Sequence, residues 1–541
     1  MKRFGKTILV AALIFVLCTG CFGCRLFSGK YPIFTPTYGE RAYVQPDEEL
    51  QQRLNDELRA LSLEEGREEE LLEKRIDLFV QYYQVMTSQT IALIEYYKNT
   101  SDETAARRYE YITNYANRFF NDVLETEKIL FESSYRDVLI GQTSEEYALS
   151  LADRDVKNQA VLELEQKETA LVSEYASVYQ TASSAEFARI YKDLVVTRNA
   201  IAAEFSDDDG NPYSNYHDYA YAELYFREYT PEDAFALRNE LGEKIHPIAD
   251  SLQQTRKTYF GEQNKAGFPA ISENSLKGFA KYAVEQTVSE AAPSWNYMIN
   301  HDLYDFSVSD TKMDTSFVCD FHEYGDGFMF INASGNLSDL DVVLHEFGHY
   351  NAIFAADDEK EGNVSFNLEL AETFSQAFEL ITLPAIEKLL QKEGLSEYTS
   401  FYEYFVVENS LYTLLSGSAF EDFEYTVYRT DPDLLTADYL ENLFRTSLVR
   451  YWGSASCEYY EVPHFFESPA YYISYVVSHV FASIIWAEED YAEKYLDVVS
   501  YGTTNTLETV ASQTGLPDPL SDQAVDLIAE KYDSFIRMKF A

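Results

Sequence analysis

Residues 47–198 are charged, rich in Leu, Tyr and Ala, and nearly free of Pro and Gly, which constrains this part of the chain to long helices. Apolar residues recur there at helical spacing in two sets: Leu50, Leu54, Leu58 and Leu61, then Ile76, Phe79, Tyr82 and Tyr83. Residues three or four positions apart share one face of a helix, so each set forms an apolar stripe that needs burial. The pattern predicts long helices packed as a bundle.

A turn-rich break at residues 206–215 follows this region, and helical patterns continue from about residue 216. The best strand candidates are Phe317–Cys319 and Phe328–Asn332, the latter running into the turn signal Asn-Ala-Ser-Gly. We therefore expect a mostly α-helical, bundle-like protein with a small antiparallel β-sheet.

Residues 345–349 read His-Glu-Phe-Gly-His. On a helix, positions i and i+4 lie on one face, so His345 and His349 can direct two imidazoles at one metal ion. Zinc suits such a site because it accepts neutral imidazole and keeps a position for water. Glu346 stands beside the pair, where it can handle that water. We expect Gly348 to let another element approach closely.

The apolar residues Leu340, Val343, Leu344 and Phe347 place the motif on a helix. A second His-Glu pair begins at His322, but Asp326 holds its i+4 position, and we interpret it as a loop. A third zinc ligand is commonly a Glu on a helix some 20–25 residues further on. The apolar segment 363–380 offers three, and spacing alone does not choose among Glu369, Glu372 and Glu379.

Three stretches resemble the zinc oligopeptidases of the thimet oligopeptidase and oligoendopeptidase F family, most closely the oligoendopeptidase F branch. They are Gly327–His349, with its strand, turn and zinc helix; Leu370–Glu379; and Val462–Trp486, where one His precedes closely spaced Tyr. Weaker similarity extends the resemblance over roughly residues 190–540.

The resemblance implies a residue assignment. It selects Glu372 as the third zinc ligand, with Glu369 as the alternative, and places Glu379 where it orients a ligand His. It also implies that His464, Tyr472 and Tyr475 face the scissile carbonyl, where their N–H and O–H groups stabilise an oxyanion. The implied body is mostly helical, with a deep substrate channel and the small sheet beside the zinc helix.

The N-terminus has the features of an export signal. Lys2, Arg3 and Lys6 precede a short apolar run, residues 7–17, and small residues then lead to a cysteine. We expect Cys21 to be the lipidated first residue of a mature bacterial lipoprotein; Cys24 is the alternative, because Cys18 makes the recognition sequence imperfect. The expected divisions are a signal peptide over 1–20, a tether over 21–46, a helical domain over 47–198 and a catalytic zinc metallopeptidase domain over 199–541.

The formal net charge is −49. A chain this acidic lacks the basic surface that nucleic-acid binding needs, and attraction to anionic lipid heads is disfavoured in the same way. Membrane attachment is therefore expected through the N-terminal lipid alone. Cys319 and Cys457 form a disulfide or, as we favour, remain thiols.

Together these features predict a monomeric zinc endopeptidase, with one Zn2+ per chain, that acts on short unfolded peptides outside the cytoplasmic membrane. One alternative is a zinc exopeptidase with the same ligands. The other is a surface lipoprotein that binds peptides without turnover, although such a protein has no use for Glu346.

Overall fold

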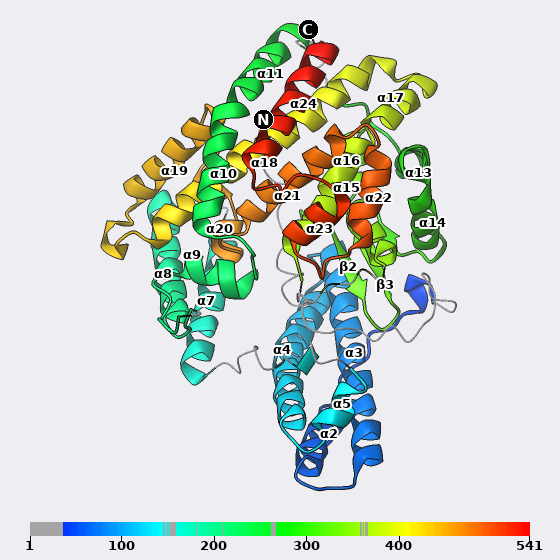
Figure 1. Cartoon of the computed structure of the whole chain (residues 1–541), viewed down its shortest axis with the longest axis vertical. Coiled ribbons are helices and arrows are strands. Elements are labelled where there is room, and N and C mark those ends of the chain that lie inside the picture. Colours follow the sequence, from blue (N-terminus) through cyan, green and yellow to red (C-terminus); the bar gives the residue numbers. More distant parts are fainter. Residues whose placement is uncertain are drawn as a thin grey trace. The chain divides into compact units, whose positions relative to one another are not determined.

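The computed structural model describes residues 36–143, 147–148, 151, 158–179, 181–207, 209–260, 267–357, 360, 362 and 366–540. It is mostly helical with a small sheet, which confirms the predicted fold class (Figure 1). The predicted signal peptide and the candidate lipidation sites Cys21 and Cys24 lie outside the described residues. Within these ranges, no helix has the length and apolar character needed to span a membrane.

The chain divides into two compact units. The larger comprises the described residues within Gln159–Trp295 and Ser334–Ala541, and the smaller those within Leu17–Asn158 and Asn296–Ala333. Helix α8 (Ser184–Ala202) passes through the boundary predicted after residue 198 and packs with α7 (Gln159–Val178) in the larger unit.

Long helices build most of the smaller unit: α2 (Glu48–Leu61), α3 (Glu68–Lys98), α4 (Glu103–Phe131) and the short α5 (Arg136–Ile140). Asp47 and Asp102 cap α2 and α4 by accepting hydrogen bonds from backbone N–H groups of the first turn. The first predicted stripe is confirmed, since Leu54, Leu58 and Leu61 are buried.

The second predicted stripe is wrong at its start. Ile76 is 65% exposed, and the buried face of α3 runs through Leu71, Leu78, Tyr82 and Val85. Apolar residues occur on more than one face of this helix, so packing against α2 and α4 selects the buried one.

The sheet lies in the smaller unit and has the order β1-β3-β2. Strands β2 (Phe317–Phe321) and β3 (Asp326–Phe330) pair antiparallel as predicted, but β1 (Tyr304–Asp305) pairs parallel with β3. The sheet is therefore mixed. A two-residue strand has no alternation to read, so only its tertiary pairing identifies it. Residues 322–325 form the β2–β3 turn, as the interpretation of His322 as a loop residue predicted.

The end of the predicted tether is packed. Arg41 makes a two-bond ion pair with Asp326, with both distances 2.7 Å and both side chains fully buried. Nearby, the Val44 N–H donates to Ser88 Oγ at 3.0 Å. The prediction of a loose tether is therefore wrong for residues 36–46, because long-range partners in the smaller unit hold them.

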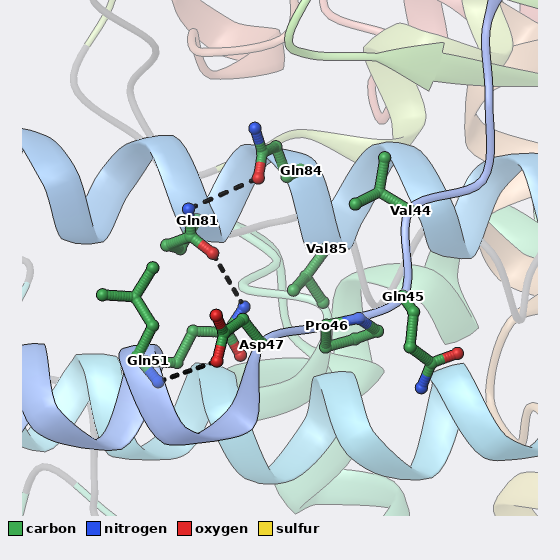
Figure 2. Close-up of a pocket in the computed structure, with 9 residues that line it drawn as sticks. Val44, Gln45, Pro46, Asp47, Gln51, Gln81, Gln84 and Val85 are labelled. Atoms are coloured by element: carbon green, nitrogen blue, oxygen red, sulfur yellow. Dashed lines mark hydrogen bonds between the residues drawn. The ribbon is translucent and has the colours of Figure 1, made fainter.

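A pocket of about 190 Å³ lies beside α2 and α3 in the same unit (Figure 2). Three glutamine side chains that line it are hydrogen bonded to one another: Gln51 Nε2 donates to Gln81 Oε1 at 3.3 Å, and Gln81 Nε2 donates to Gln84 Oε1 at 3.4 Å. The one carboxylate that lines it, Asp47, caps α2. Its lining therefore serves to join the two helices.

Helices make up most of the larger unit. Besides α7 and α8, its helices include α9 (Tyr216–Tyr219), η2 (Ala220–Leu224), α10 (Pro231–Lys244), α11 (His246–Tyr259), α13 (Glu273–Thr287), α15 (Asp339–Ala355), α16 (Leu368–Ile381), α17 (Leu383–Lys392), α18 (Thr399–Tyr428), α19 (Ala437–Trp452), α20 (His464–Glu467), α21 (Tyr472–Ala487), α22 (Tyr491–Ser500), α23 (Leu507–Thr514) and α24 (Asp522–Phe540). Helix α14 (Ala292–Asn300) crosses the boundary between the units. The largely buried helix α16 packs against both α15 and α21, and these three helices carry the candidate site.

Candidate metal centre

Helix α15 carries the His-Glu-Phe-Gly-His motif, and a carboxylate organises its start. Asp339 accepts hydrogen bonds from the backbone N–H groups of Ser334, Gly335 and Asn336, at 2.9, 2.7 and 3.1 Å. The apolar residues predicted to face the core are fully buried: Leu340, Val343, Leu344 and Phe347. The motif is therefore on a rigid, buried helix, as predicted.

Gly348 allows α16 to touch α15. A Cβ at this position would lie 2.5 Å from both Phe374 O and Ser375 Cα. Real Cβ atoms do not approach backbone this closely, so only glycine fits without a shift of the helices. The predicted close approach is confirmed, and it brings Glu372 on α16 to the two histidines of α15.

His345, His349 and Glu372 form a group whose ligand atoms all lie within 4.8 Å of one another. Glu372 Oε2 is 3.8 Å from His345 Nε2 and 3.6 Å from His349 Nε2. This oxygen is buried and has no hydrogen-bond partner among the described residues, whereas Oε1 accepts from the Tyr471 hydroxyl at 2.9 Å.

An unpaired buried carboxylate oxygen is costly unless a cation or donor satisfies it. Burial opposes ionisation of Glu372, but the neighbouring His349 and His345 and the Tyr471 hydroxyl hold its pKa below the usual value. Two imidazole nitrogens and one carboxylate oxygen are a donor set that suits zinc and fits several other divalent ions. The residues therefore fit a divalent metal.

Glu379 fixes the orientation of one ligand. Its Oε1 lies 2.5 Å from His345 Nδ1, so the other ring nitrogen, Nε2, faces Glu372. Burial, with the charge of Glu372, raises the pKa of Glu379 to about 8. Such a partner sets the tautomer of a ligating histidine, which is the role predicted for Glu379.

The alternative ligand Glu369 has other partners. Its Oε1 accepts from Arg227 Nε at 3.0 Å, from the Tyr229 hydroxyl at 2.8 Å and from Ser474 Oγ at 2.7 Å. The structure thus separates two glutamates that lie one turn apart on α16, and brings only Glu372 to the histidines.

Glu346 is buried beside the group, and its Oε2 has no hydrogen-bond partner among the described residues. Burial raises its pKa, while the charges of His345 and His349 act in the opposite direction. A carboxylate with a free oxygen and a raised pKa is suited to accept and release a proton.

His464 and the tyrosines of α21 lie close together. The ring centroid of His464 is 4.9 Å from that of Tyr472, 5.3 Å from that of Tyr471 and 6.2 Å from that of Tyr475. Burial lowers the pKa of His464 to about 4, so the ring is neutral and carries one N–H donor. Neither ring nitrogen has a hydrogen-bond partner in the part of the chain that the structure describes.

The tyrosines differ in their surroundings. The Tyr475 ring lies 5.0 Å from that of Tyr471, and burial, with the charges of Glu372, Tyr472 and Glu346, raises the pKa of Tyr475. The Tyr472 ring packs edge-on against Phe420, with ring centroids 4.6 Å apart. Burial is the main cause that raises the pKa of Tyr472, and the charges of Tyr412, Cys457 and Glu424 raise it further.

Tyr471, which the sequence reasoning did not select, is hydrogen bonded to Glu372. The signal was present, because Tyr471 and Tyr475 are four residues apart and share a helix face, whereas Tyr472 is turned about 100° from Tyr471.

Neither Cys319 nor Cys457 forms a disulfide, which confirms the favoured prediction that both remain thiols. Burial raises the pKa of Cys457 to about 12, which disfavours a nucleophilic thiolate there.

No family model matches the chain. Among curated proteins, the chromosomal oligoendopeptidase F of Lactococcus lactis subsp. cremoris is 24% identical over 209 residues, which cover 35% of this chain and 33% of that protein. The matched part of the chain thus spans about a third of the relative's length.

Several solved structures share the fold over nearly their whole length. PZ peptidase A with an inhibitor has a TM-score of 0.75 at 21% identity, covering 92% of this chain and 99% of its own. A putative oligoendopeptidase F from Bacillus anthracis has a TM-score of 0.73 at 18% identity, covering 93% and 98%. Metallocarboxypeptidase 1 of Trypanosoma cruzi is more distant, with a TM-score of 0.53 at 12% identity and coverage of 91% and 99%. The comparisons confirm the resemblance to oligoendopeptidase F and the mostly helical fold with a small sheet.

Proposed function

We propose that this chain is a zinc-dependent endopeptidase that hydrolyses internal bonds of short, unfolded peptides. One observation carries the proposal: the buried, unpaired Oε2 of Glu372 lies 3.6–3.8 Å from the Nε2 atoms of both His349 and His345. A cation among these three atoms satisfies all of them at once. The sequence similarity to oligoendopeptidase F and the shared fold support the reaction class.

The residues around the metal position have separable roles. A divalent ion held by His345, His349 and Glu372 would supply Lewis acidity for the substrate carbonyl and lower the pKa of an attacking water. Glu346 takes the proton from that water and delivers it to the leaving amine. His464 and Tyr475 donate hydrogen bonds to the oxyanion that develops on the substrate carbonyl. Glu379 and Tyr471 hold His345 and Glu372 in place.

The test is hydrolysis of internally quenched, end-blocked peptides by the purified chain from Lys30 on, with metal content measured in parallel. We expect about one zinc per chain and internal cleavage in the wild type. Glu346→Gln should keep the metal and lose turnover. Glu323→Gln is the matched control, because it changes the exposed glutamate of the other His-Glu pair. A wild type without bound metal would contradict the proposal.

An exopeptidase is the second candidate, because the fold is shared with a metallocarboxypeptidase as well as with oligoendopeptidases. The two activities differ in their need for a free chain end. Cleavage of a peptide blocked at both ends supports the endopeptidase, whereas cleavage only after the ends are unblocked supports the exopeptidase. Bound metal with no cleavage of any peptide would favour a peptide-binding protein.

We also propose that Cys21 carries a lipid that anchors the chain outside the cytoplasmic membrane, as the positive start and short apolar run suggest. The full chain should partition into a detergent phase, and Cys21→Ser should move it to the aqueous phase. Cys24→Ser is the matched control; loss of partitioning in that variant alone would assign the lipid to Cys24.

A further inference from the structure

Residues 464–471, called here the carbonyl segment, carry His464 at one end and Tyr471 at the other. Because His464 has no hydrogen-bond partner among the described residues, no side-chain hydrogen bond sets the direction of its ring. The ring is buried, and its position follows from the backbone that bears it. Contacts to the backbone of residues 464–471 therefore fix the position of the His464 ring.

Two arginines hold the carbonyl segment from opposite ends. Arg198 on α8 donates to the carbonyl oxygens of Phe465 and Phe466, at 2.9 and 2.5 Å. Arg227, which follows η2, donates from Nη2 to Ala470 O at 2.7 Å. Both arginine side chains are fully buried, so these charged hydrogen bonds are not weakened by solvent.

Arg227 also ties the segment to the helix of the third metal ligand. Its Nε donates to Glu369 Oε1 at 3.0 Å, and Glu369 precedes Glu372 by three residues on α16. Its Nη2 reaches Ser474 Oγ on α21 at 2.7 Å, and this hydroxyl donates to the same Glu369 oxygen at 2.7 Å. One guanidinium thus connects α16, the carbonyl segment and the start of α21.

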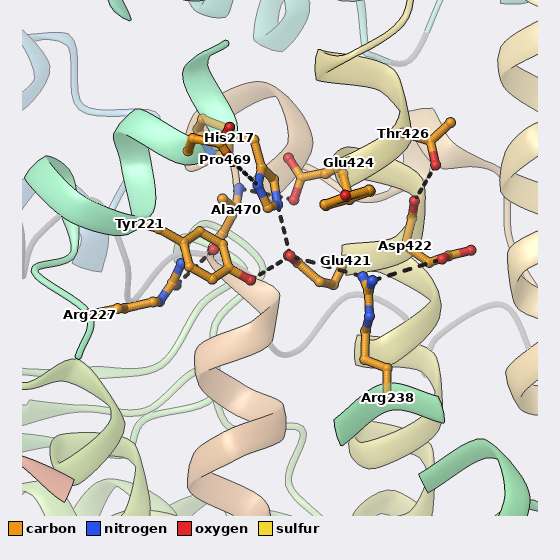
Figure 3. A network of polar contacts seen from close by, with 12 residues as sticks. His217, Tyr221, Arg227, Arg238, Glu421, Asp422, Glu424, Thr426, Pro469 and Ala470 are labelled. Atoms are coloured by element: carbon orange, nitrogen blue, oxygen red, sulfur yellow. Dashed lines mark hydrogen bonds and ion pairs between the residues drawn. The ribbon is translucent and has the colours of Figure 1, made fainter. Parts of the chain in front are cut away.

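The backbone at Ala470 shows how firmly the segment is held. Ala470 has φ +60°, a left-handed conformation that a residue with a Cβ rarely adopts. Its N–H donates to Glu424 Oε2 at 3.0 Å while Arg227 binds its carbonyl, and the Tyr225 hydroxyl donates to Pro469 O at 3.0 Å. Figure 3 shows Arg227 and Glu424 meeting at Ala470. Such strain persists only where several contacts determine it together.

We propose that Arg198 and Arg227 are positioning residues: Arg198 holds the carbonyl segment to α8, and Arg227 holds it against the Glu372 helix, so that His464 and Tyr471 keep their places at the metal centre. The catalytic consequence rests on the proposed peptidase function. The holding role itself does not, since it concerns only the folded chain.

The main test is Arg227→Lys, because an ammonium cannot reproduce the planar set of bonds to Glu369, Ala470 and Ser474. We expect unchanged metal content and little change in KM. We expect kcat to fall about 100-fold, because a displacement of a group at the active site by about 1 Å has an effect of this size. Amide hydrogen exchange in residues 464–475 should be about tenfold faster. This second readout does not depend on activity.

Arg238→Lys is the matched control. Arg238 on α10 is also fully buried, but it lies 4.0 Å from its charge partners Glu421 and Asp422, and its side-chain nitrogens have no hydrogen-bond partner among the described residues. In Arg238→Lys, amide hydrogen exchange at residues 464–475 and kcat should both match the wild type. Equal loosening of the segment in both variants would show a general effect of altering a buried charge and would overturn the proposal.

A milder pair of variants covers the case in which Arg227→Lys does not fold. Tyr225→Phe removes only the hydrogen bond to Pro469, and we expect faster exchange in the segment with a kcat about fivefold lower, the effect of one hydrogen bond. Tyr221→Phe, the control, removes a hydrogen bond to Glu421 instead and should change neither.

The outcomes separate the two proposals. Unchanged exchange in Arg227→Lys, or in Tyr225→Phe if the former does not fold, overturns the holding role. Faster exchange with an unchanged kcat overturns the positioning role. If the wild type binds metal but cleaves no peptide, the proposed function fails, and the exchange comparison still decides whether the arginines hold the segment.

Discussion

The Tyr471 hydroxyl donates a 2.9 Å hydrogen bond to Oε1 of Glu372 and leaves Oε2 directed at the two imidazoles of α15. A carboxylate with one oxygen occupied by a fixed donor presents the other in a defined direction. Tyr471 therefore orients Glu372 by a hydrogen bond, as Glu379 orients His345, so each of these two candidate ligands has its own hydrogen-bond partner.

Tyr471→Phe should weaken zinc binding about 10–100-fold, because loss of a partner that orients a ligand has this effect on metal affinity. Competition with a chelator of known affinity measures the change. Tyr472→Phe is the matched control, since the Tyr472 ring packs against Phe420 and the charges that raise its pKa are those of Tyr412, Cys457 and Glu424. Equal affinity of Tyr471→Phe and wild type would show that Glu372 is oriented by packing alone.

Gly348→Ala should lower the free energy of unfolding by about 1–3 kcal/mol and weaken metal binding, because the new methyl group meets backbone of α16 that cannot rotate away. Denaturant unfolding and metal content measure the two effects. Gly278→Ala on α13 is the control: a Cβ there meets nothing within 4 Å, so the change should stabilise the helix by up to about 1 kcal/mol. A stable, fully metallated Gly348→Ala would contradict the close approach of α15 and α16.

Glu467 should make stability depend on pH. Burial raises its pKa to about 7, although Arg198 acts in the opposite direction. A raised pKa in the folded state means that the stabilising contribution is complete below the unfolded value, near 4.5, and is lost as pH rises through about 7. Glu467→Gln should therefore show a smaller fall in stability between pH 5 and 8. The difference should reach at most about 3 kcal/mol, from the size of the shift.

The measurement is denaturant unfolding of wild type and variant at several pH values. Glu163→Gln is a suitable control, because it makes the same substitution at a solvent-facing residue of α7. Parallel curves for wild type and Glu467→Gln would show that Glu467 ionises freely in the folded chain.

Arg41→Met should destabilise the smaller unit by about 3–5 kcal/mol, because Asp326 then remains buried without its counter-charge. The Tyr297 hydroxyl, 3.0 Å from Asp326 Oδ2, compensates only in part. Thermal unfolding measures the loss. Arg107→Met is the control, because Arg107 forms an exposed pair with Glu103 on α4, and its replacement should leave the transition unchanged.

Helical periodicity made much of this protein predictable. The helix of residues 339–355 and its buried face follow from the spacing of apolar residues, and the pairing of His345 with His349 follows from the pitch of a helix. The small residue at position 348 indicated a close neighbour, which proved to be α16. These features depend on residues within one or two turns of each other, so a local pattern contains them.

Local patterns failed where partners are distant in the chain. Glu369 and Glu372 are one turn apart on an apolar helix, and Arg227, 142 residues before Glu369, is among the groups that occupy Glu369. Arg41 holds the end of the predicted tether through Asp326, 285 residues away. Nothing near residues 304–305 marks them as a strand; the pairing with β3 does.

The sequence by itself determined the helical class of the fold, the pair of histidines on one helix face and the glutamate beside it, because hydrophobic spacing and helix pitch are properties of contiguous residues. The tertiary structure alone decided which glutamate faces the histidines and which tyrosine supports that glutamate. It also decided which arginines hold the segment that carries His464. These features depend on which buried charged groups are paired when helices distant in the chain pack together. The free-energy cost of leaving a buried group unpaired depends on the whole assembled core.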